Sequence, residues 1–246
     1  DEKMMLHKQH FGILSEVVSG EECDTCARLK NLVMPARLRL LPAPKGLKAE
    51  LRPYQKEGFS WLHFLQSNDL GGCLADDMGL GKTLQTLALL LWNREQMQAR
   101  RDAARARDAV REDTKERQLS LFSRNMPPAT SLIIVPASLC HNWHNEIERF
   151  TPSLRTLIHY GPARHRSASQ FTAYDIIISS YHTVRQDIEI FTQLNFFYVV
   201  LDESQHIKNP SSHIYRSVMR LRADNRLVLT GTPVENSLTD LWTQLN

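Results

Sequence analysis

The sequence has 246 residues, of which 42% are hydrophobic and 23% are charged, and 30 basic against 27 acidic residues leave a net charge of +3. This composition is typical of a globular protein with a buried core, and it excludes collagen-like, low-complexity and wholly disordered chains. The longest apolar runs, such as 87–92, are too short to cross a bilayer, and the first residues do not resemble a signal peptide, so we expect no membrane partner.

Residues 1–47 have weak periodicity and end in the proline-rich stretch Leu41-Pro-Ala-Pro-Lys-Gly46, which predicts an N-terminal extension with a stiff linker. The four cysteines of the chain are too scattered for a disulfide framework and favour a reducing, intracellular setting. Two of them, with two nearby histidines, suggest a zinc site, but free cysteines and surface histidines explain the set better because its order is reversed from that of a usual zinc finger: His7, His10, Cys23 and Cys26.

From residue 51 onward, β-rich runs alternate with helix-like stretches, and several runs are apolar at every position, as in 132–135. Strands that are buried on both faces have this composition, so we predict an α/β fold with a doubly wound, mostly parallel sheet flanked by helices. The predicted strands are Gly72–Ala75, Ser131–Val135, Thr156–Tyr160, Asp175–Ser179, Phe196–Leu201 and Arg226–Leu229. The predicted helices are Pro53–Gln66, Lys82–Asn93, Leu139–Phe150, Ser211–Leu221 and a segment after Ser237.

A charged insert over about 94–128 interrupts this alternation. Its acids and bases are mixed and interspersed with alanines, which favours a solvated helix or partial disorder over an arm that contacts nucleic acid or a partner. At the other end, residues 238–246 begin an amphipathic helix that has no terminator, so we expect the chain to be part of a longer protein.

A glycine-bearing loop follows the first strand and precedes a strongly apolar helix, with Gly79-Leu-Gly81-Lys82-Thr83 at the junction. Glycines let backbone N–H groups approach phosphate oxygens, and a helix N-terminus adds further N–H groups. Lys82 would reach the β- and γ-phosphates of a nucleotide, and the Thr83 hydroxyl would bind Mg²⁺. Asp76 stands where the general phosphate-loop pattern has glycine, so a helix start that carries Gly-Lys-Thr by chance is the alternative.

Two adjacent acids, Asp202 and Glu203, follow the buried run 196–201. Carboxylates at the C-terminal end of a parallel strand lie in the crevice where α/β sheets bind ligands. Asp202 could hold Mg²⁺ while Glu203 polarises the attacking water, although an acidic pair after a strand is by itself usually a solvated turn.

The whole stretch from about 50 to 246 resembles the first RecA-like lobe of the Swi/Snf-type helicase-like ATPases of helicase superfamily two. Matching segments occur in the family's order at 51–62, 74–83, 132–146, 175–184 and 227–242. The resemblance implies a RecA-like ATP-binding lobe over 48–246, and in this family an acid at position 76 is normal. It implies nucleotide contacts from Gln55, on the adenine, and from Asp77, Met78, Gly79, Leu80, Gly81, Lys82, Thr83 and Gln205.

Gln205 stands where the family commonly has histidine. Glutamine can exchange hydrogen bonds but cannot titrate, so we expect ATP binding and hydrolysis to survive and the coupling of nucleotide state to motion to change. The family's coupling segment corresponds to Thr230, Gly231 and Thr232.

The resemblance also implies contacts with a DNA backbone from Pro136, Ala137, Ser138 and Leu139, and from Ser180 and Tyr181 at a strand tip. Arg164 and Arg166 lie in the stretch 149–174, which contains no acid at all. A phosphate-binding loop and a solvated loop explain these arginines equally well.

The resemblance predicts an ATP- and Mg²⁺-dependent motor that moves on double-stranded DNA, with Lys82, Asp202 and Glu203 as its catalytic residues and full hydrolysis only with the C-terminal RecA-like lobe. Its target would be a DNA-bound protein complex, in the nucleus of a eukaryote or at the nucleoid in the cytoplasm of a bacterium. A strand-separating helicase and a non-hydrolysing nucleic-acid-binding module are the alternatives.

Overall fold

The computed structural model describes residues 38–77, 79–110, 130–162, 164–207, 209 and 211–231. All six predicted strands are present, and their ends lie within four residues of the prediction. The elements in chain order are α3 (Pro53–Ser67), β1 (Gly72–Leu74), α4 (Lys82–Val110), β2 (Ser131–Val135), η1 (Ala137–Leu139), α6 (Cys140–Phe150), β3 (Thr156–His159), η2 (Ala168–Ala173), β4 (Ile176–Ser180), α7 (Tyr181–Gln186), α8 (Ile188–Phe191), β5 (Asn195–Leu201), η3 (Ser204–Ile207), α9 (His213–Met219) and β6 (Arg222–Leu229).

The six strands form one parallel sheet in the order β1-β6-β5-β2-β4-β3. The predicted parallel α/β sheet is therefore confirmed. Because every strand runs the same way, the C-terminal ends of all six lie along one edge of the sheet, where α/β folds bind their ligands. Loops that are far apart in the sequence meet at this edge.

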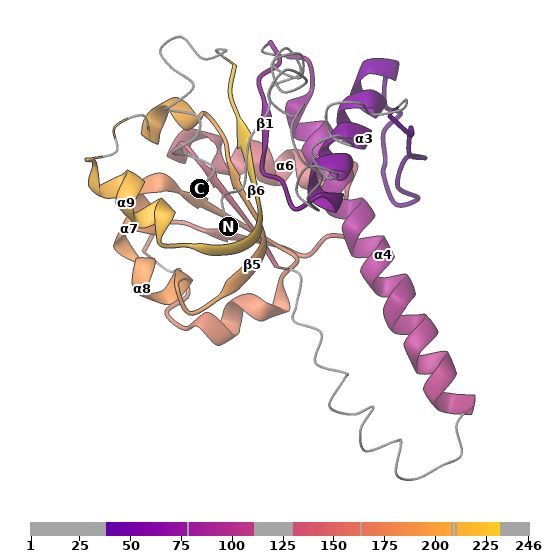
Figure 1. The fold of residues 1–246 in the computed structure, drawn as a ribbon. Helices are drawn as coiled ribbons and strands as arrows, with labels where there is room; N and C mark the ends of the chain where they lie inside the picture. Colours follow the sequence, from indigo (N-terminus) through magenta and orange to yellow (C-terminus); the bar gives the residue numbers. More distant parts are fainter. Residues whose placement is uncertain are drawn as a thin grey trace, which may run out of the picture.

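Alternate residues of each strand enter two separate cores. Ile133 and Val135 of β2 pack toward α3, α4 and α6, whereas Leu132 and Ile134 pack toward α7, α8 and α9. Figure 1 shows these two sets of helices on opposite sides of the sheet. The continuous apolar runs of the sequence thus reflect strands that are covered on both faces.

The helix that begins at Lys82 is longer than predicted, because it continues past Asn93 to Val110. The apolar stripe ends near Asn93, but alanine, arginine and glutamine after it favour helix, and no glycine or proline interrupts it. The first part of the charged insert is therefore a solvated helix, which extends away from the sheet in Figure 1. The segment 181–191, left unassigned by the sequence pattern, forms α7 and α8.

Residues 38–50 lie against three helices of the domain. The backbone N–H of Leu41 donates to Ser60 Oγ at 3.0 Å, that of Gly46 to Glu95 Oε1 at 2.7 Å, and that of Lys48 to the Phe150 carbonyl at 2.7 Å. The end of the predicted linker is thus attached to α3, α4 and α6. The proposed zinc ligands and the predicted helix after Ser237 lie outside the described residues.

Among the described residues, no helix combines the length and apolar character that a bilayer crossing requires.

Candidate nucleotide-binding site

The loop between β1 and α4 is shaped by its two glycines, which have left-handed φ angles of 84° (Gly79) and 76° (Gly81). The Lys82 ammonium group folds back over this loop and donates to the carbonyl oxygens of Asp76 at 2.6 Å and Asp77 at 3.1 Å. Lys82 thus lies at the mouth of a loop that ends at a helix N-terminus, which is the arrangement that binds phosphate groups.

Gln55 joins the start of α3 to the phosphate loop. It is 6% exposed, its Oε1 accepts from the Arg52 backbone N–H at 3.0 Å, and its Nε2 donates to the Leu80 carbonyl at 3.2 Å. A Cβ added to Gly81 would lie 2.4 Å from Gln55 Nε2, so a side chain at this position would displace the amide. The predicted adenine contact of Gln55 stays a prediction, and the structure adds a role in holding the loop.

Asp202 and Glu203 follow the last residue of β5, as predicted, at the edge where the phosphate loop lies. The Asp202 carboxylate is held on both oxygens: Oδ1 accepts from the Glu203 backbone N–H at 2.9 Å, and Oδ2 accepts from Trp143 Nε1 at 2.8 Å. Its carbonyl oxygen accepts from the Tyr181 hydroxyl at 2.8 Å. The orientation of this carboxylate is therefore fixed by the protein alone.

Burial raises the pKa of Asp202, and the charge of Glu203 adds to this, while the Trp143 hydrogen bond and the charge of Lys82 lower it in part. These interactions show that the phosphate loop and the acidic pair act on one another electrostatically. Glu203 has a left-handed φ of 50°, a conformation that costs a non-glycine residue roughly 1–2 kcal/mol. Such strain is concentrated at functional sites.

Two residues of α6 complete the site, and sequence reasoning assigned no role to either. Trp143 is 2% exposed and bonds Asp202 as described. Glu146, one turn later, is half-buried beside Thr83 and Asp202: burial raises its pKa, and a hydrogen bond from the Thr83 side chain lowers it in part. The signal in the sequence was a carboxylate on the apolar stripe that also contains Cys140, Trp143 and Ile147.

The side chains at this point suit Mg²⁺, which prefers hard oxygen ligands and is usually held by one or two carboxylates together with substrate phosphates. Thr83 supplies a hydroxyl and Asp202 a carboxylate, and Glu146 is close to both. In the part of the chain that the structure describes, no cluster of three or more histidine, cysteine, aspartate or glutamate side chains is arranged to hold a metal ion. A Mg²⁺ ion here would therefore share its coordination with a nucleotide.

The residues expected to contact DNA differ in accessibility. Ala137 and Ser138 are exposed at the tip of β2, and Pro136 and Leu139 are half-buried beside them. By contrast, the side chains of Ser180 and Tyr181 point inward, with 2% and 5% exposure, because Ser180 caps α7 and Tyr181 bonds Asp202. Neither of these two side chains reaches the surface for a DNA contact.

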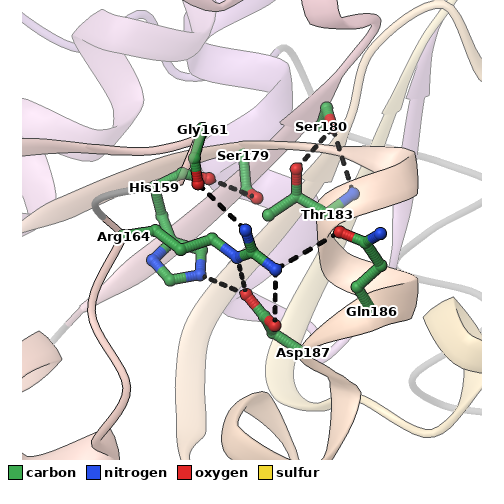
Figure 2. Close-up of polar contacts among 8 residues, drawn as sticks. All are labelled: His159, Gly161, Arg164, Ser179, Ser180, Thr183, Gln186 and Asp187. Carbon is green, nitrogen blue, oxygen red and sulfur yellow. Dashed lines mark hydrogen bonds and ion pairs between the residues drawn. The ribbon is translucent and has the colours of Figure 1, made fainter.

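Arg164 is engaged within the protein, whereas Arg166 is exposed. Figure 2 shows Arg164 in a two-pronged ion pair with Asp187, which also accepts from His159 Nε2 at 2.9 Å. Arg164 further donates to the Gly161 carbonyl at 2.9 Å. Its guanidinium group therefore organises the loop after β3, which contradicts the expectation of a free phosphate-binding side chain, while the expectation for Arg166 stays a prediction.

A family model described as the SNF2-related domain matches residues 54–246. The chain belongs to this family. It is 34% identical over 233 residues to the yeast "TATA-binding protein-associated factor MOT1", a match that covers 94% of the chain and 12% of that protein. It is 33% identical over 231 residues to the Bacillus subtilis "Putative ATP-dependent helicase/translocase YwqA", which covers 91% of the chain and 22% of the relative.

Among solved structures, the Sulfolobus solfataricus SWI2/SNF2 ATPase core in complex with dsDNA matches with a TM-score of 0.63 and 35% identity, over 84% of the chain and 37% of that protein. The SNF2-related domain described here is thus a lobe of the helicase superfamily two type, and the resemblance inferred from the motifs is confirmed. The chain covers 12% and 22% of the length of the two curated relatives named above.

The remaining predicted residues of the SNF2-related domain are placed in part. The backbone N–H of Thr230, directly after β6, donates to the Leu74 carbonyl at 3.2 Å, so the start of the predicted coupling segment adjoins β1. Gln205 lies in η3, directly after the acidic pair. Met78 and Thr232 lie outside the described residues.

Proposed function

We propose that this chain is the ATP-binding lobe of a motor that hydrolyses Mg²⁺-ATP to move along double-stranded DNA and to displace or remodel a DNA-bound protein complex. The proposal rests on one observation: Lys82, Asp202 and Glu203 lie at the same edge of a parallel sheet, and Trp143 orients the Asp202 carboxylate. Membership of the SNF2-related family and the likeness to an ATPase core solved with dsDNA support it.

Each side chain has a distinct task in hydrolysis. Lys82 would leave the loop carbonyls to neutralise the β- and γ-phosphate oxygens, and the glycine loop would supply backbone N–H groups. Thr83 and Asp202 would hold Mg²⁺, which neutralises charge that develops on the phosphates. Glu203 would orient and deprotonate the attacking water.

Full turnover requires more than this lobe. In superfamily-two motors of this kind, arginines that stabilise the transition state come from a second RecA-like lobe, and such an arginine contributes roughly 10³–10⁵ in rate. The partner is therefore the C-terminal lobe of the same protein. The exposed turn 136–139 and Arg166 would contact DNA phosphates, so binding would depend on salt more than on base sequence.

Two substitutions test the nucleotide site. Lys82→Ala should weaken ATP binding at least about tenfold, because a phosphate loses its cation. Glu203→Gln should leave ATP affinity near that of the wild type and lower turnover about 100-fold or more, because the general base is lost. The measurements are binding of a fluorescent ATP analogue and release of phosphate, and equal ATP affinity in wild type and Lys82→Ala would contradict the assignment.

Turnover by the longest natural form of the protein, measured against duplexes of increasing length, tests the motor. We expect turnover to rise with duplex length and then to saturate, because a translocating motor takes many steps before it dissociates. Turnover that is indifferent to DNA would refute the translocase and leave the ATP site. A strand-displacement assay in parallel distinguishes a strand-separating helicase.

A further inference from the structure

We infer that α6 transmits DNA contact to the nucleotide site, with Trp143 and Glu146 as its two positioning residues. The inference rests on the proposed function, because it takes duplex DNA as the ligand of the exposed turn that precedes α6. It adds a second connection between DNA contact and the nucleotide site, besides the proposed coupling segment that begins at Thr230.

The order of the strands places α6 at a boundary. Along the C-terminal edge, the proposed nucleotide residues follow β1 and β5, and the proposed coupling segment follows β6, which lies between these two strands. The exposed turn 136–139 follows β2, on the other side of β5. Since β2 pairs directly with β5, the start of α6 lies beside the acidic pair. The backbone N–H of Asp202 donates to the Ile134 carbonyl at 2.9 Å, which fixes the two strand ends to each other.

Trp143 connects the two halves of this edge. It follows the exposed turn by four residues, a rise of about 6 Å along a helix, and its indole N–H donates to Asp202 Oδ2 at 2.8 Å. A hydrogen bond of this kind weakens steeply when the donor moves away or turns. A shift of α6 by about 1 Å would therefore change the orientation of the Asp202 carboxylate.

Glu146 makes the second connection, toward Thr83 in the first turn of α4. The Thr83 side chain and the charge of Asp202 both act on the Glu146 carboxylate, so this group lies near both residues. One rigid helix thus contacts both of the residues expected to hold Mg²⁺. A DNA phosphate that draws the turn 136–139 in one direction would move both contacts together.

The test removes the indole hydrogen bond and uses a matched control for the ring atoms that are lost with it. Trp143→Phe keeps an aromatic ring in the core and deletes the N–H group, and Trp61→Phe is the matched control. Trp61 also packs against the core on this side of the sheet, and its buried Nε1 has no hydrogen-bond partner among the described residues. The two variants therefore lose the same atoms, but only one loses a bond to Asp202.

Two quantities are measured in the longest natural form of the protein. One is the affinity for Mn²⁺ in the presence of ADP, from the electron paramagnetic resonance of free and bound manganese. The other is the factor by which a saturating duplex changes the affinity for Mg²⁺-ADP, which is a coupling free energy between two sites. Neither depends on turnover.

Trp143→Phe should weaken Mn²⁺ binding about tenfold or more, as expected when a partner of a metal-binding carboxylate is lost. In Trp143→Phe, duplex DNA should also no longer change the affinity for Mg²⁺-ADP, so that the ratio of affinities with and without DNA is close to one. The affinity for DNA in the absence of nucleotide, and the affinity for metal-free ADP, should stay at the wild-type level. Trp61→Phe should change none of these. Wild-type values of both quantities in Trp143→Phe would overturn the inference, and weakened Mn²⁺ binding with an unchanged DNA factor would overturn the coupling role.

Glu146→Gln is the second variant, for the case that Trp143→Phe does not fold. Glu146 is only half-buried, and glutamine keeps its shape and one acceptor oxygen for Thr83. We expect it to lower Mn²⁺ affinity and the DNA-dependent factor in the same direction as Trp143→Phe. Should the wild-type protein itself show no effect of DNA on nucleotide affinity, the coupling role of α6 fails, whereas the proposed function fails only if turnover is indifferent to DNA; the Mn²⁺ measurement still tests the positioning of Asp202 separately.

Discussion

Gly81 meets two requirements at once, which explains why the phosphate loop has glycine there. Its φ angle of 76° is left-handed, and a Cβ would lie 2.4 Å from Gln55 Nε2. Gly79 has only the first requirement, because its φ is 84° but, among the described residues other than its chain neighbours, no atom lies within 4 Å of the position of a Cβ. Substitutions at the two glycines can therefore distinguish the effect of backbone strain from the effect of displacing the Gln55 amide.

Gly81→Ala should weaken ATP binding more than Gly79→Ala. Both substitutions add left-handed strain of roughly 1–2 kcal/mol, but only the first pushes the Gln55 amide away from the Leu80 carbonyl. A fluorescent ATP analogue measures the difference, which we expect to be about tenfold, equivalent to one lost hydrogen bond of about 1.4 kcal/mol. Equal losses in the two variants would show that Gln55 does not support the loop.

At the scale of elements, a buried ion pair attaches the loop after β3 to the junction of α7 and α8. Asp187 is 7% exposed and accepts from Arg164 and His159, as Figure 2 shows, while the His159 ring lies edge-on to Phe171 and Phe191 at 5.0 and 5.2 Å. By contrast, the ion pair of Asp102 and Arg105 on α4 is mostly exposed and 4.0 Å long. Because the first pair is largely buried, breaking it should lower the free energy of unfolding. The second pair is exposed, so its loss should change the free energy of unfolding very little.

Asp187→Asn should lower the free energy of unfolding by about 3 kcal/mol, because it leaves the Arg164 guanidinium partly buried without a charge partner. Asp102→Asn removes the same charge and should change stability by less than about 0.5 kcal/mol. Urea unfolding of both variants makes the comparison. Similar stability in the two variants would mean that the pair near β3 contributes no more than a surface pair.

At the scale of the whole molecule, ionisable groups in the fold act in opposite directions on stability. Burial lowers the pKa of His159, although its bond to Asp187 opposes this. The pKa values of Asp175 and Asp187 are also lowered: burial raises both, but hydrogen bonds and charges from arginines outweigh it, with His159 also contributing at Asp187. Burial raises the pKa of Asp202 and of Glu146. At neutral pH these two carboxylates therefore lower the free energy of unfolding, whereas Asp175 and Asp187 raise it.

His159, and then Asp175 and Asp187, should each lower the free energy of unfolding as pH falls, while Asp202 and Glu146, whose pKa values are raised, offset part of the second decrease. Below about 6.5 the unfolded chain binds a proton at His159 before the folded chain does, and below about 4 the same holds for Asp175 and Asp187. His159→Gln keeps a donor for Asp187 and should flatten the dependence between pH 7.5 and 5.5. His213→Gln, at an exposed position, is the control that should keep the wild-type slope. Urea unfolding at pH 7.5, 5.5 and 3.5 provides the data, and equal slopes for His159→Gln and wild type would contradict this assignment.

The strands, the phosphate loop and the acidic pair were predictable from the sequence because each depends on local chemistry. Continuous apolar runs indicate strands covered on both faces, and Gly-Lys-Thr between a strand and a helix indicates a phosphate site. The extension of α4 to Val110 was missed because the apolar stripe ends before the helix does. The role of Arg164 was also missed, because a sequence does not show which acid a base will meet.

How these local features work together depends on the three-dimensional arrangement of the strands. The sequence predicted that Lys82, Asp202 and Glu203 belong to a nucleotide site, but the order of the strands determined that β2 lies beside β5 and that Trp143 therefore reaches Asp202. Residues 59 positions apart form this 2.8 Å bond. The physical reason is that hydrogen bonds act over a few ångströms in space, and strand pairing, which no local pattern specifies, decides which residues come that close.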